Sequence, residues 1–416
     1  MAANPPKIEN APGLTWRPRK NGWEARWQCR TDLAQRGYAI KSVGIWVGAE
    51  PPTDLETMTI QDRCNSLQAE MLVWGRDGLP QVSEFKGTVK SLIDCYQTDR
   101  DSPFRKLRYE TRRFYRQLCK RIEADFGETL VADIKARQIL HWHAGIKDEG
   151  KIAMAHALVG MFRTLCSFGS TFLEDDGCAK LSGVLSNMRF EMPKPRNERL
   201  TAEQAVLIRA QAHKAGWHSI AFAQALQFEL FLRQKDVIGE WVPISENAPI
   251  TDVLDGNNKW LRGIRWEEID GTLRLTHITS KRQKLVDPDL KLAPMVMEEL
   301  ALIYGQGFTR ADLPASGPII INEKNGRPWL ANEFRRWWRK IAKDAGVPVT
   351  VRNMDSRAGA ISESTDAGAD LEHVRHAATH SDIGMTQRYS RGSQDKVAGV
   401  MEKRVAHRNK TGTKEG

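Results

Sequence analysis

The second half of the chain contains polar residues whose types could act together on an anionic group. Arg233 ends the apolar segment FELFLR, and Asp236 follows three residues later. Lys281 lies in THITSKRQK just after a predicted strand, where a flexible ammonium could swing toward a ligand. Arg357 stands in NMDSRAGA. A guanidinium is planar and permanently charged, so two of them are suited to holding the oxygens of an oxyanion.

His380 and Tyr389 complete the series, nine residues apart in ATHSDIGMTQRYSRG. Taken singly, each residue has an ordinary explanation. Arg233 could cap the C-terminus of its helix, Lys281 could be a solvated turn residue, and Tyr389 could be a half-buried packing residue. It is the joint order and spacing that favour a functional site over these explanations.

In this order and spacing the residues resemble the catalytic domain of the tyrosine recombinases, the phage-integrase family, over roughly residues 200 to 395. Members of that family place an Arg with an acidic residue three positions later, a β-hairpin Lys, a His-x-x-Arg box, a Gly-His-Ser-like box, and a Tyr nine residues after that His. Four of these five elements are present. The most specific is the last, which runs from His380-Ser381-Asp382 through Met385-Thr386 to Arg388-Tyr389.

The resemblance implies a reaction on a phosphodiester. Tyr389 would attack phosphorus and form a covalent 3′-phosphotyrosyl bond, which stores the bond energy and removes the need for ATP. Lys281 would protonate the leaving 5′-oxygen. Neither a cofactor nor a metal is expected.

The same resemblance gives the remaining residues supporting parts. Arg233 and Arg357 would hold the phosphate oxygens and the charge that builds in the transition state. His380 would donate a hydrogen bond to the phosphate, and Asp236 would orient Arg233.

Met354 departs from the family pattern, which usually has His three residues before the second Arg. A thioether can neither donate nor accept a proton. The general-base role often given to that His is therefore unfilled here, or passes to a neighbour such as Asp355.

Length and charge agree with a multidomain protein that binds a polyanion. The chain has 416 residues, a net charge of +10 and a pI near 9.3, so we expect two or three domains and a partner such as nucleic acid. We expect no membrane span and no signal peptide, and a cytoplasmic location. The six cysteines form no C-x-x-C pair and are expected to be reduced thiols.

The predicted fold class is mainly α with small β-sheets, divided into five parts. Residues 1–82 form a β-sheet-plus-helix module resembling an arm-type DNA-binding domain, and 83–188 form a helical core-binding domain. Residues 189–200, with the motif EMPKPRNER, form a linker. A mixed α+β catalytic domain covers 201–395, and 396–416 form a basic tail.

Several elements can be predicted in detail. The dipeptide Asn21-Gly22 favours a β-hairpin, and Thr201 with Gln204 indicates a capping box. Strands over 263–269 and 272–279 are predicted to join at Asp270-Gly271.

A basic stripe is predicted on a helix from about Ser102 to Ala124. The apolar side of that helix would comprise Leu107, Phe114, Leu118 and Ile122, and the basic side Arg105, Arg108, Arg112 and Arg116. Such a stripe is typical of phosphate contacts, and the alternative is an ordinary solvated face.

The predicted partners are double-stranded DNA attachment sites and further copies of the chain, as a tetramer on DNA and a dimer or monomer when free. A DNA-bending accessory protein is a further candidate, and a membrane is not expected. Two rival functions remain open: a DNA-binding protein without catalysis and a relaxing topoisomerase.

A zinc site is the other alternative. His373, His376 and His380 recur at helical spacing, but no carboxylate or Cys completes the set. His141-Trp142-His143 alternates as on a strand or loop, with no third ligand in view.

Overall fold

The computed structural model describes residues 7–19, 22–35, 38, 40–77, 84–246, 251–387 and 401–408. The chain divides into two compact units. The first contains residues 1–196 with 243–248 and 255–257, and the second contains the rest of the chain.

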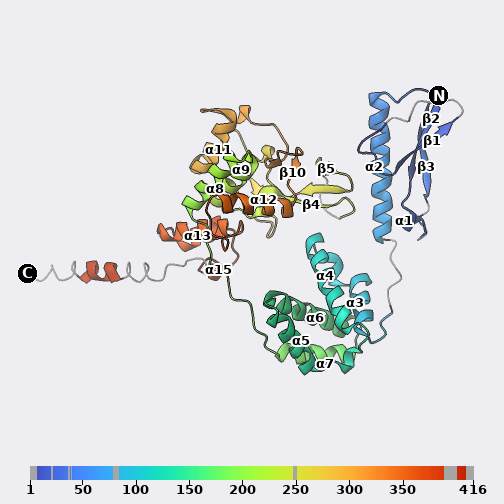
Figure 1. Ribbon diagram of the computed structural model, residues 1–416, viewed down its shortest axis with the longest axis horizontal. Coiled ribbons are helices and arrows are strands. Elements are labelled where there is room, and N and C mark those ends of the chain that lie inside the picture. The colour runs from blue at the N-terminus through green and yellow to red at the C-terminus, as the bar shows by residue number, and fades with distance from the viewer. Residues whose placement is uncertain are drawn as a thin grey trace, which may run out of the picture. The chain divides into compact units, whose positions relative to one another are not determined.

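The N-terminal part is a three-stranded antiparallel sheet with a long helix beside it (Figure 1). Strands β1 (Leu14–Arg19) and β2 (Gly22–Gln28) pair from Leu14↔Trp27 to Arg19↔Gly22, and β3 (Ser42–Gly48) pairs with β2. After the short α1 (Thr31–Gln35), α2 (Asp54–Asp77) buries Ile60, Leu67 and Met71 against the sheet. The predicted hairpin and helix are confirmed.

Five helices follow: α3 (Val89–Thr98), α4 (Tyr109–Phe126), α5 (Ala136–Asp148), α6 (Ile152–Phe172) and α7 (Asp176–Asn187). The hydrophobic side chains of α6 form the centre of their shared core, with Phe162 and Leu165 fully buried. All six cysteines of the chain are buried, and they are thiols, not disulfides. Burial raises the pKa of Cys119 to about 12 and that of Cys64 to about 11, so these thiols stay protonated.

By length and composition alone, α6 is a candidate membrane span, and half of its most apolar window is buried inside the protein. A buried core helix meets the same criteria, so the expectation of no membrane span stays a prediction. Helix α6 also carries Arg163, which donates to the carbonyls of Leu185 and Met188. A core helix of a helical bundle has the same composition as a span.

The helix predicted over residues 102–124 is interrupted near its start. Ser102 caps a short 3₁₀ turn, Pro103–Lys106, and Leu107 is extended (φ −71°, ψ 152°), so α4 begins only at Tyr109. The ring of Pro103 favours such a first turn but removes one backbone donor. The buried stripe of α4 is Leu118, Cys119 and Ile122, whereas the predicted core residue Phe114 is 43% exposed.

The second unit is built around α9 (His218–Glu229), which is buried along nearly its whole length. It contacts α8 (Ala202–Lys214), α11 (Pro294–Tyr304) and α13 (Asp355–Asp366). The predicted capping box is confirmed, since Gln204 N donates to Thr201 Oγ1 and Thr201 N to Gln204 Oε1. Further helices among the described residues are α10 (Gln234–Ile238), α12 (Ala331–Asp344), α14 (Leu371–Ala377) and α15 (Ile383–Gln387), and residues 401–408 are also helical.

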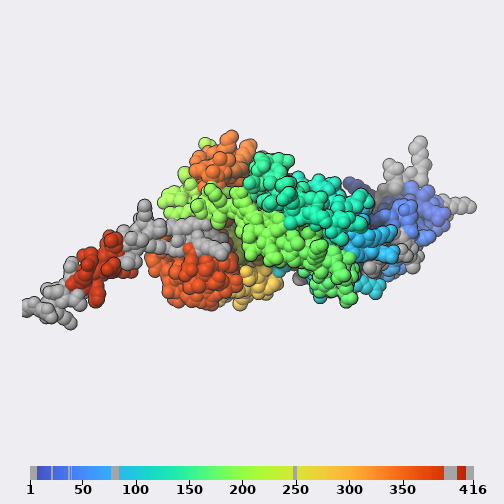
Figure 2. All heavy atoms as spheres, turned by 90° about the horizontal axis from the view of Figure 1, so that it is seen from below, coloured from blue at the N-terminus to red at the C-terminus, as the bar shows by residue number. Residues whose placement is uncertain are grey.

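Three small sheets complete this part. Strands β4 (Glu240–Pro243), β6 (Asn258–Leu261) and β5 (Leu254–Asp255) are neighbours in that order. β7 (His277–Ile278) pairs with β8 (Leu285–Val286), and β9 (Ile321–Asn322) with β10 (Arg327–Pro328). Helices α13, α14 and α15 are orange-red in Figure 1, and their surface is seen in the same colour in Figure 2.

The hairpin predicted at Asp270-Gly271 is formed only as a short, irregular turn. The two segments meet antiparallel at the bridge Ile269↔Leu275, where Asp270 N donates to the carbonyl of Arg274 at 3.0 Å and Thr276 N to that of Glu268 at 2.8 Å, but they form no regular ladder. The carboxylate of Asp270 accepts the backbone N–H groups of Thr272 and Arg274, which closes a compact loop in place of a two-residue turn. The regular hairpin of this region is β7–β8, one step further along the chain.

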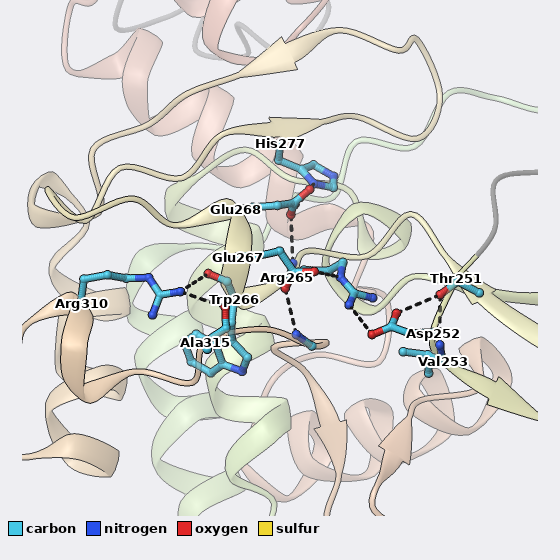
Figure 3. Close-up of polar contacts among 11 residues, drawn as sticks. Thr251, Asp252, Val253, Arg265, Trp266, Glu267, Glu268, His277, Arg310 and Ala315 are labelled. Carbon is cyan, nitrogen blue, oxygen red and sulfur yellow. Dashed lines mark hydrogen bonds and ion pairs between the residues drawn. The ribbon is translucent and has the colours of Figure 1, made fainter. Parts of the chain in front are cut away.

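Polar contacts fix the base of that hairpin (Figure 3). Glu268 accepts the backbone N–H of Arg265 at 2.9 Å and lies 3.0 Å from His277 Nδ1, at the first residue of β7. Nearby, the guanidinium of Arg310 donates to five backbone carbonyls, those of Trp266, Ile269, Leu313, Pro314 and Ala315. The side chains of Glu268 and Arg310 therefore hold the loops at the base of the β7–β8 hairpin, whose regular ladder contains two residue pairs.

Candidate functional site

Arg233 and Asp236 lie at the start of α10, directly after the central helix α9. Asp236 is fully buried, and its Oδ2 accepts the backbone N–H of Arg233 at 3.2 Å and lies 3.9 Å from Arg233 Nη1. That Nη1 is buried and has no hydrogen-bond partner among the described residues. The other carboxylate oxygen, Oδ1, accepts the backbone N–H of Ser280 at 2.6 Å. Asp236 thus joins the Arg233 segment to the β7–β8 turn.

The β7–β8 turn carries three cations in four residues. Thr279 closes it, because its N and Oγ1 both donate to the carbonyl of Lys284, at 2.9 and 3.0 Å. Lys281 and Arg282 are exposed at the tip and make no hydrogen bond or ion pair within the described part of the chain. Lys284 is half-buried, and its Nζ donates to the carbonyl of His380 at 3.3 Å.

Arg357 lies in the first half of α13, which is fixed against α9 by reciprocal amide hydrogen bonds between Asn353 and Gln227. Its guanidinium donates to the carbonyls of Phe231 and Ala378. Phe231 is two residues before Arg233, and Ala378 is two residues before His380. Arg357 therefore contacts both the segment that carries Arg233 and the segment that carries His380.

His380 follows α14 and is 2% exposed. Thr379, just before it, turns the chain inward with a φ of +51°. The His380 carbonyl also accepts Arg375 Nη1 at 3.0 Å, and its ring Nδ1 is 3.0 Å from the hydroxyl of the fully buried Thr386. Thr386 lies on α15 and orients the imidazole.

The charges around His380 are cationic. Burial and, after it, the positive charges of Arg357, Arg233, Arg282 and Lys284 together lower the pKa of His380 from 6.5 to about 4. His380 is therefore neutral at pH 7. The same set of charges favours an anionic ligand at this position.

Met354 precedes this group at the start of α13 and is 63% exposed. Its neighbour Asp355 is buried, and Asp355 Oδ2 accepts the backbone N–H of Arg352 at 2.8 Å. Since this carboxylate is buried and accepts a backbone N–H, it is a poor replacement for a solvent-exposed general base.

The structure brings together Arg233, Asp236, Arg357, His380 and the turn that carries Lys281. Tyr389 and its neighbour Arg388 lie outside the described residues, which end in this region at Gln387. Their place relative to the cluster remains a prediction.

The histidines considered for zinc do not converge. His373 and His376 are exposed on α14, whereas His380 points into the core. Within the described ranges no group of three His, Cys, Asp or Glu residues could hold a metal ion. His141 and His143, predicted on a strand or loop, are on α5, and His143 packs against the Phe190 ring at 4.9 Å between centroids.

The basic stripe is not one helical face. Arg105 is in the 3₁₀ turn and Arg108 is the N-terminal cap residue of α4, so only Arg112 and Arg116 are on the helix. Arg112 Nη1 donates to the carbonyls of Arg105 and Leu107, at 3.2 and 3.0 Å, and Arg116 lies over the ring of Phe104 at 5.4 Å. Part of this charge has a structural use in the helical domain.

Sequence reasoning missed Arg282, Lys284 and Thr386. The run Lys281-Arg282-Gln283-Lys284 shows that several cations share one turn, but it does not show which of them turns inward. Thr386 lies within the motif from His380 to Tyr389, yet a Thr six residues after a His does not by itself indicate a contact between the two side chains.

No family model and no curated protein sequence matches the chain, but solved structures do. A lambda integrase dimer bound to a COC′ core site matches with a TM-score of 0.53 and 17% identity, covering 92% of this chain and 96% of that one. A Tn1549 transposon integrase in complex with circular intermediate DNA matches with a TM-score of 0.50 and 15% identity, covering 76% and 99%. Identities this low show the fold. The resemblance to the tyrosine recombinases is confirmed at that level: the chain has the fold of lambda integrase and of the Tn1549 integrase.

Proposed function

We propose that this protein is a site-specific DNA recombinase that cuts and rejoins DNA strands through a covalent 3′-phosphotyrosyl intermediate, integrating or excising a mobile element. The observation that supports this most is the cationic cluster around the buried, neutral His380. Such a cluster suits a phosphodiester, whose charge must be neutralised before a nucleophile can approach.

The proposed reaction uses the residues of the cluster in named roles. The Tyr389 hydroxyl loses its proton to solvent as its oxygen attacks phosphorus, the new O–P bond forms, and the bond to the 5′-oxygen breaks. Lys281, exposed and unengaged at the tip of its turn, gives a proton to that leaving oxygen. Rejoining is the reverse, with the 5′-hydroxyl of another strand as nucleophile. No ATP, metal or other cofactor enters this balance.

The other groups act on the phosphate. Arg233 Nη1, which has no hydrogen-bond partner among the described residues, is a donor available to a phosphate oxygen. Arg357 adds a second guanidinium, and neutral His380 donates one N–H. Asp236 fixes Arg233 through its backbone.

The proposed partner is double-stranded DNA carrying an attachment site, bound by several copies of the chain. Lambda integrase has been solved as a tetramer bound to a Holliday junction, in a structure that this chain matches with a TM-score of 0.50. We propose the same stoichiometry on DNA, with residues 83–188 binding the core site and residues 1–82 binding separate arm sites. Arg105, Arg108, Arg112 and Arg116 remain the proposed phosphate contacts of the helical domain.

A DNA-binding protein without catalysis is the second candidate. It is favoured by Met354, because no described neighbour of Met354 offers an exposed base in its place. The presence of Tyr389 at the family spacing argues against it, since binding alone needs no nucleophile.

Trapping of a covalent adduct tests the proposal. Nicked duplexes are made from the DNA that flanks the coding region, and incubated with the full chain in excess EDTA. Wild type is expected to give a protease-sensitive, slowly migrating adduct, and Tyr389→Phe none while still shifting DNA, since phosphate contacts carry the binding. An adduct that persists in Tyr389→Phe refutes the nucleophile. Loss of all cleavage in EDTA refutes metal-free chemistry.

A further inference from the structure

We infer that Lys284 is a positioning residue, which ties the β7–β8 turn to the His380 segment and so places Lys281 to protonate the leaving group. The inference rests on the proposed function. It assigns different roles to Lys281 and Lys284, which are three positions apart in the same turn.

The turn is held at both ends by contacts to the other segments of the site. At its start, the Ser280 N–H donates to the buried carboxylate of Asp236, which also accepts the N–H of Arg233. At its end, Lys284 Nζ donates to the His380 carbonyl at 3.3 Å. The regular ladder contains two residue pairs, His277↔Val286 and Ile278↔Leu285, and the pairing continues at the bridge Arg274↔Asp289. These pairs, with the closure at Thr279, hold the two strands together, whereas the Ser280 and Lys284 contacts tie the tip to the Arg233 and His380 segments.

The surroundings of the two ammonium groups assign their roles. Lys284 is half-buried and its hydrogen bond ends on a backbone carbonyl that Arg375 also reaches, at 3.0 Å. A backbone carbonyl takes no proton, and a group bound to it is held where it is. Lys281 is exposed and makes no hydrogen bond or ion pair within the described ranges, so its ammonium is available to approach a leaving oxygen.

Loss of the Lys284 contact should therefore slow protonation and leave DNA binding nearly unchanged. A displacement of a reacting group by about 1 Å can reduce a rate by about 10²-fold. The defect should depend on whether the leaving group needs a proton at all.

Single-turnover cleavage with two substrates tests this. Both are suicide duplexes on the attachment core that gives the Tyr389-dependent adduct, one with the natural 5′-oxygen and one with sulfur in its place. A thiolate leaves without protonation, so it bypasses the acid. Lys284→Met keeps the chain length and removes the donor, Lys284→Arg restores a donor, and Arg282→Met is the control for loss of a nearby charge.

Lys284→Met is expected to cleave the oxygen substrate about 10²-fold more slowly than wild type, and the sulfur substrate within about threefold of wild type. Lys281→Met should show the same defect on the oxygen substrate alone, and Lys284→Arg should recover much of the rate. Arg282→Met should not show a defect that is confined to the oxygen substrate. Sulfur-substrate cleavage also shows that each variant is folded.

Three results would overturn the inference: a Lys284→Met rate equal to wild type on the oxygen substrate, an equal defect on both substrates, or an equal defect in Arg282→Met. Each of these results can be interpreted only when wild type forms the Tyr389-dependent adduct. Absence of any Tyr389-dependent adduct in wild type would instead refute the proposed function.

Discussion

Acidification should destabilise the second unit through His380. This ring is neutral in the folded protein because burial and four neighbouring cations lower its pKa from 6.5 to about 4. In the unfolded chain it binds a proton near its ordinary pKa. Between these two values the unfolded state holds one proton more than the folded state, so stability falls as the pH falls.

The size and the pH window follow from the two pKa values. Above pH 6.5 both states are neutral and His380 has no effect. Each pH unit within the window costs about 1.4 kcal/mol, so about 2 kcal/mol should be lost at pH 5 and roughly 3 kcal/mol below pH 4. This is the opposite of a His that gains an acidic partner, whose stabilisation is lost as the pH rises.

The assay compares wild type with His380→Gln in urea unfolding at pH 7.5, 6 and 5. The amide of Gln cannot titrate and can still hydrogen-bond the Thr386 hydroxyl. Carboxylates elsewhere titrate equally in both proteins, so the difference between their free energies of unfolding isolates His380. That difference should shrink by about 2 kcal/mol between pH 7.5 and 5. Parallel pH curves would show that His380 is not held neutral by the cluster.

Three further predictions concern single residues. Thr379→Gly should raise the free energy of unfolding by about 1 kcal/mol, because a β-branched residue is strained at φ +51° and Gly is not, whereas Thr379→Ser should give little of this gain in urea unfolding. Glu299→Ala should cost about 3 kcal/mol, because buried Arg209 loses its 2.6 Å partner and keeps only the more exposed Glu298, at 3.0 Å. Combining it with Arg209→Met should cost less, as a double-mutant cycle would show. Met354→His should leave the single-turnover cleavage rate within a few fold of wild type, because Met354 is exposed, while Arg357→Ala should abolish cleavage. A cleavage rate raised by about 10²-fold or more in Met354→His would support the binding-only candidate.

Most of the fold could be predicted because its elements follow from local pattern. The Thr201 capping box depends on two residues three positions apart, and the β1–β2 hairpin on the neighbouring pair Asn21-Gly22. The predictions failed where another local interaction was stronger than the one that the pattern indicated. Pro103 favoured a 3₁₀ turn within a predicted helix, and Asp270 used its carboxylate to bind backbone N–H groups within a predicted hairpin.

The site was predictable in residue types and only partly in geometry. The order of Arg233, Arg357 and His380 could be read directly, and the structure brings these three segments together. The contacts that join them go largely to backbone atoms: Arg357 to Phe231 and Ala378, and Lys284 to His380. A backbone carbonyl exists at every position, so no sequence pattern can mark the one that a distant lysine will reach.

The charge balance explains why the site is suited to an anion. Both oxygens of Asp236, the carboxylate beside Arg233, are already used by backbone N–H groups. Four cations act on one neutral imidazole, and the nearest carboxylate oxygen to Arg233 Nη1 is 3.9 Å away, beyond hydrogen-bonding distance. Bringing these cations together costs free energy in the unbound protein, and a phosphate that enters the cluster recovers it. Binding of a phosphodiester should therefore stabilise the second unit and raise the pKa of His380 at the same time, since both effects come from the same neutralised charge.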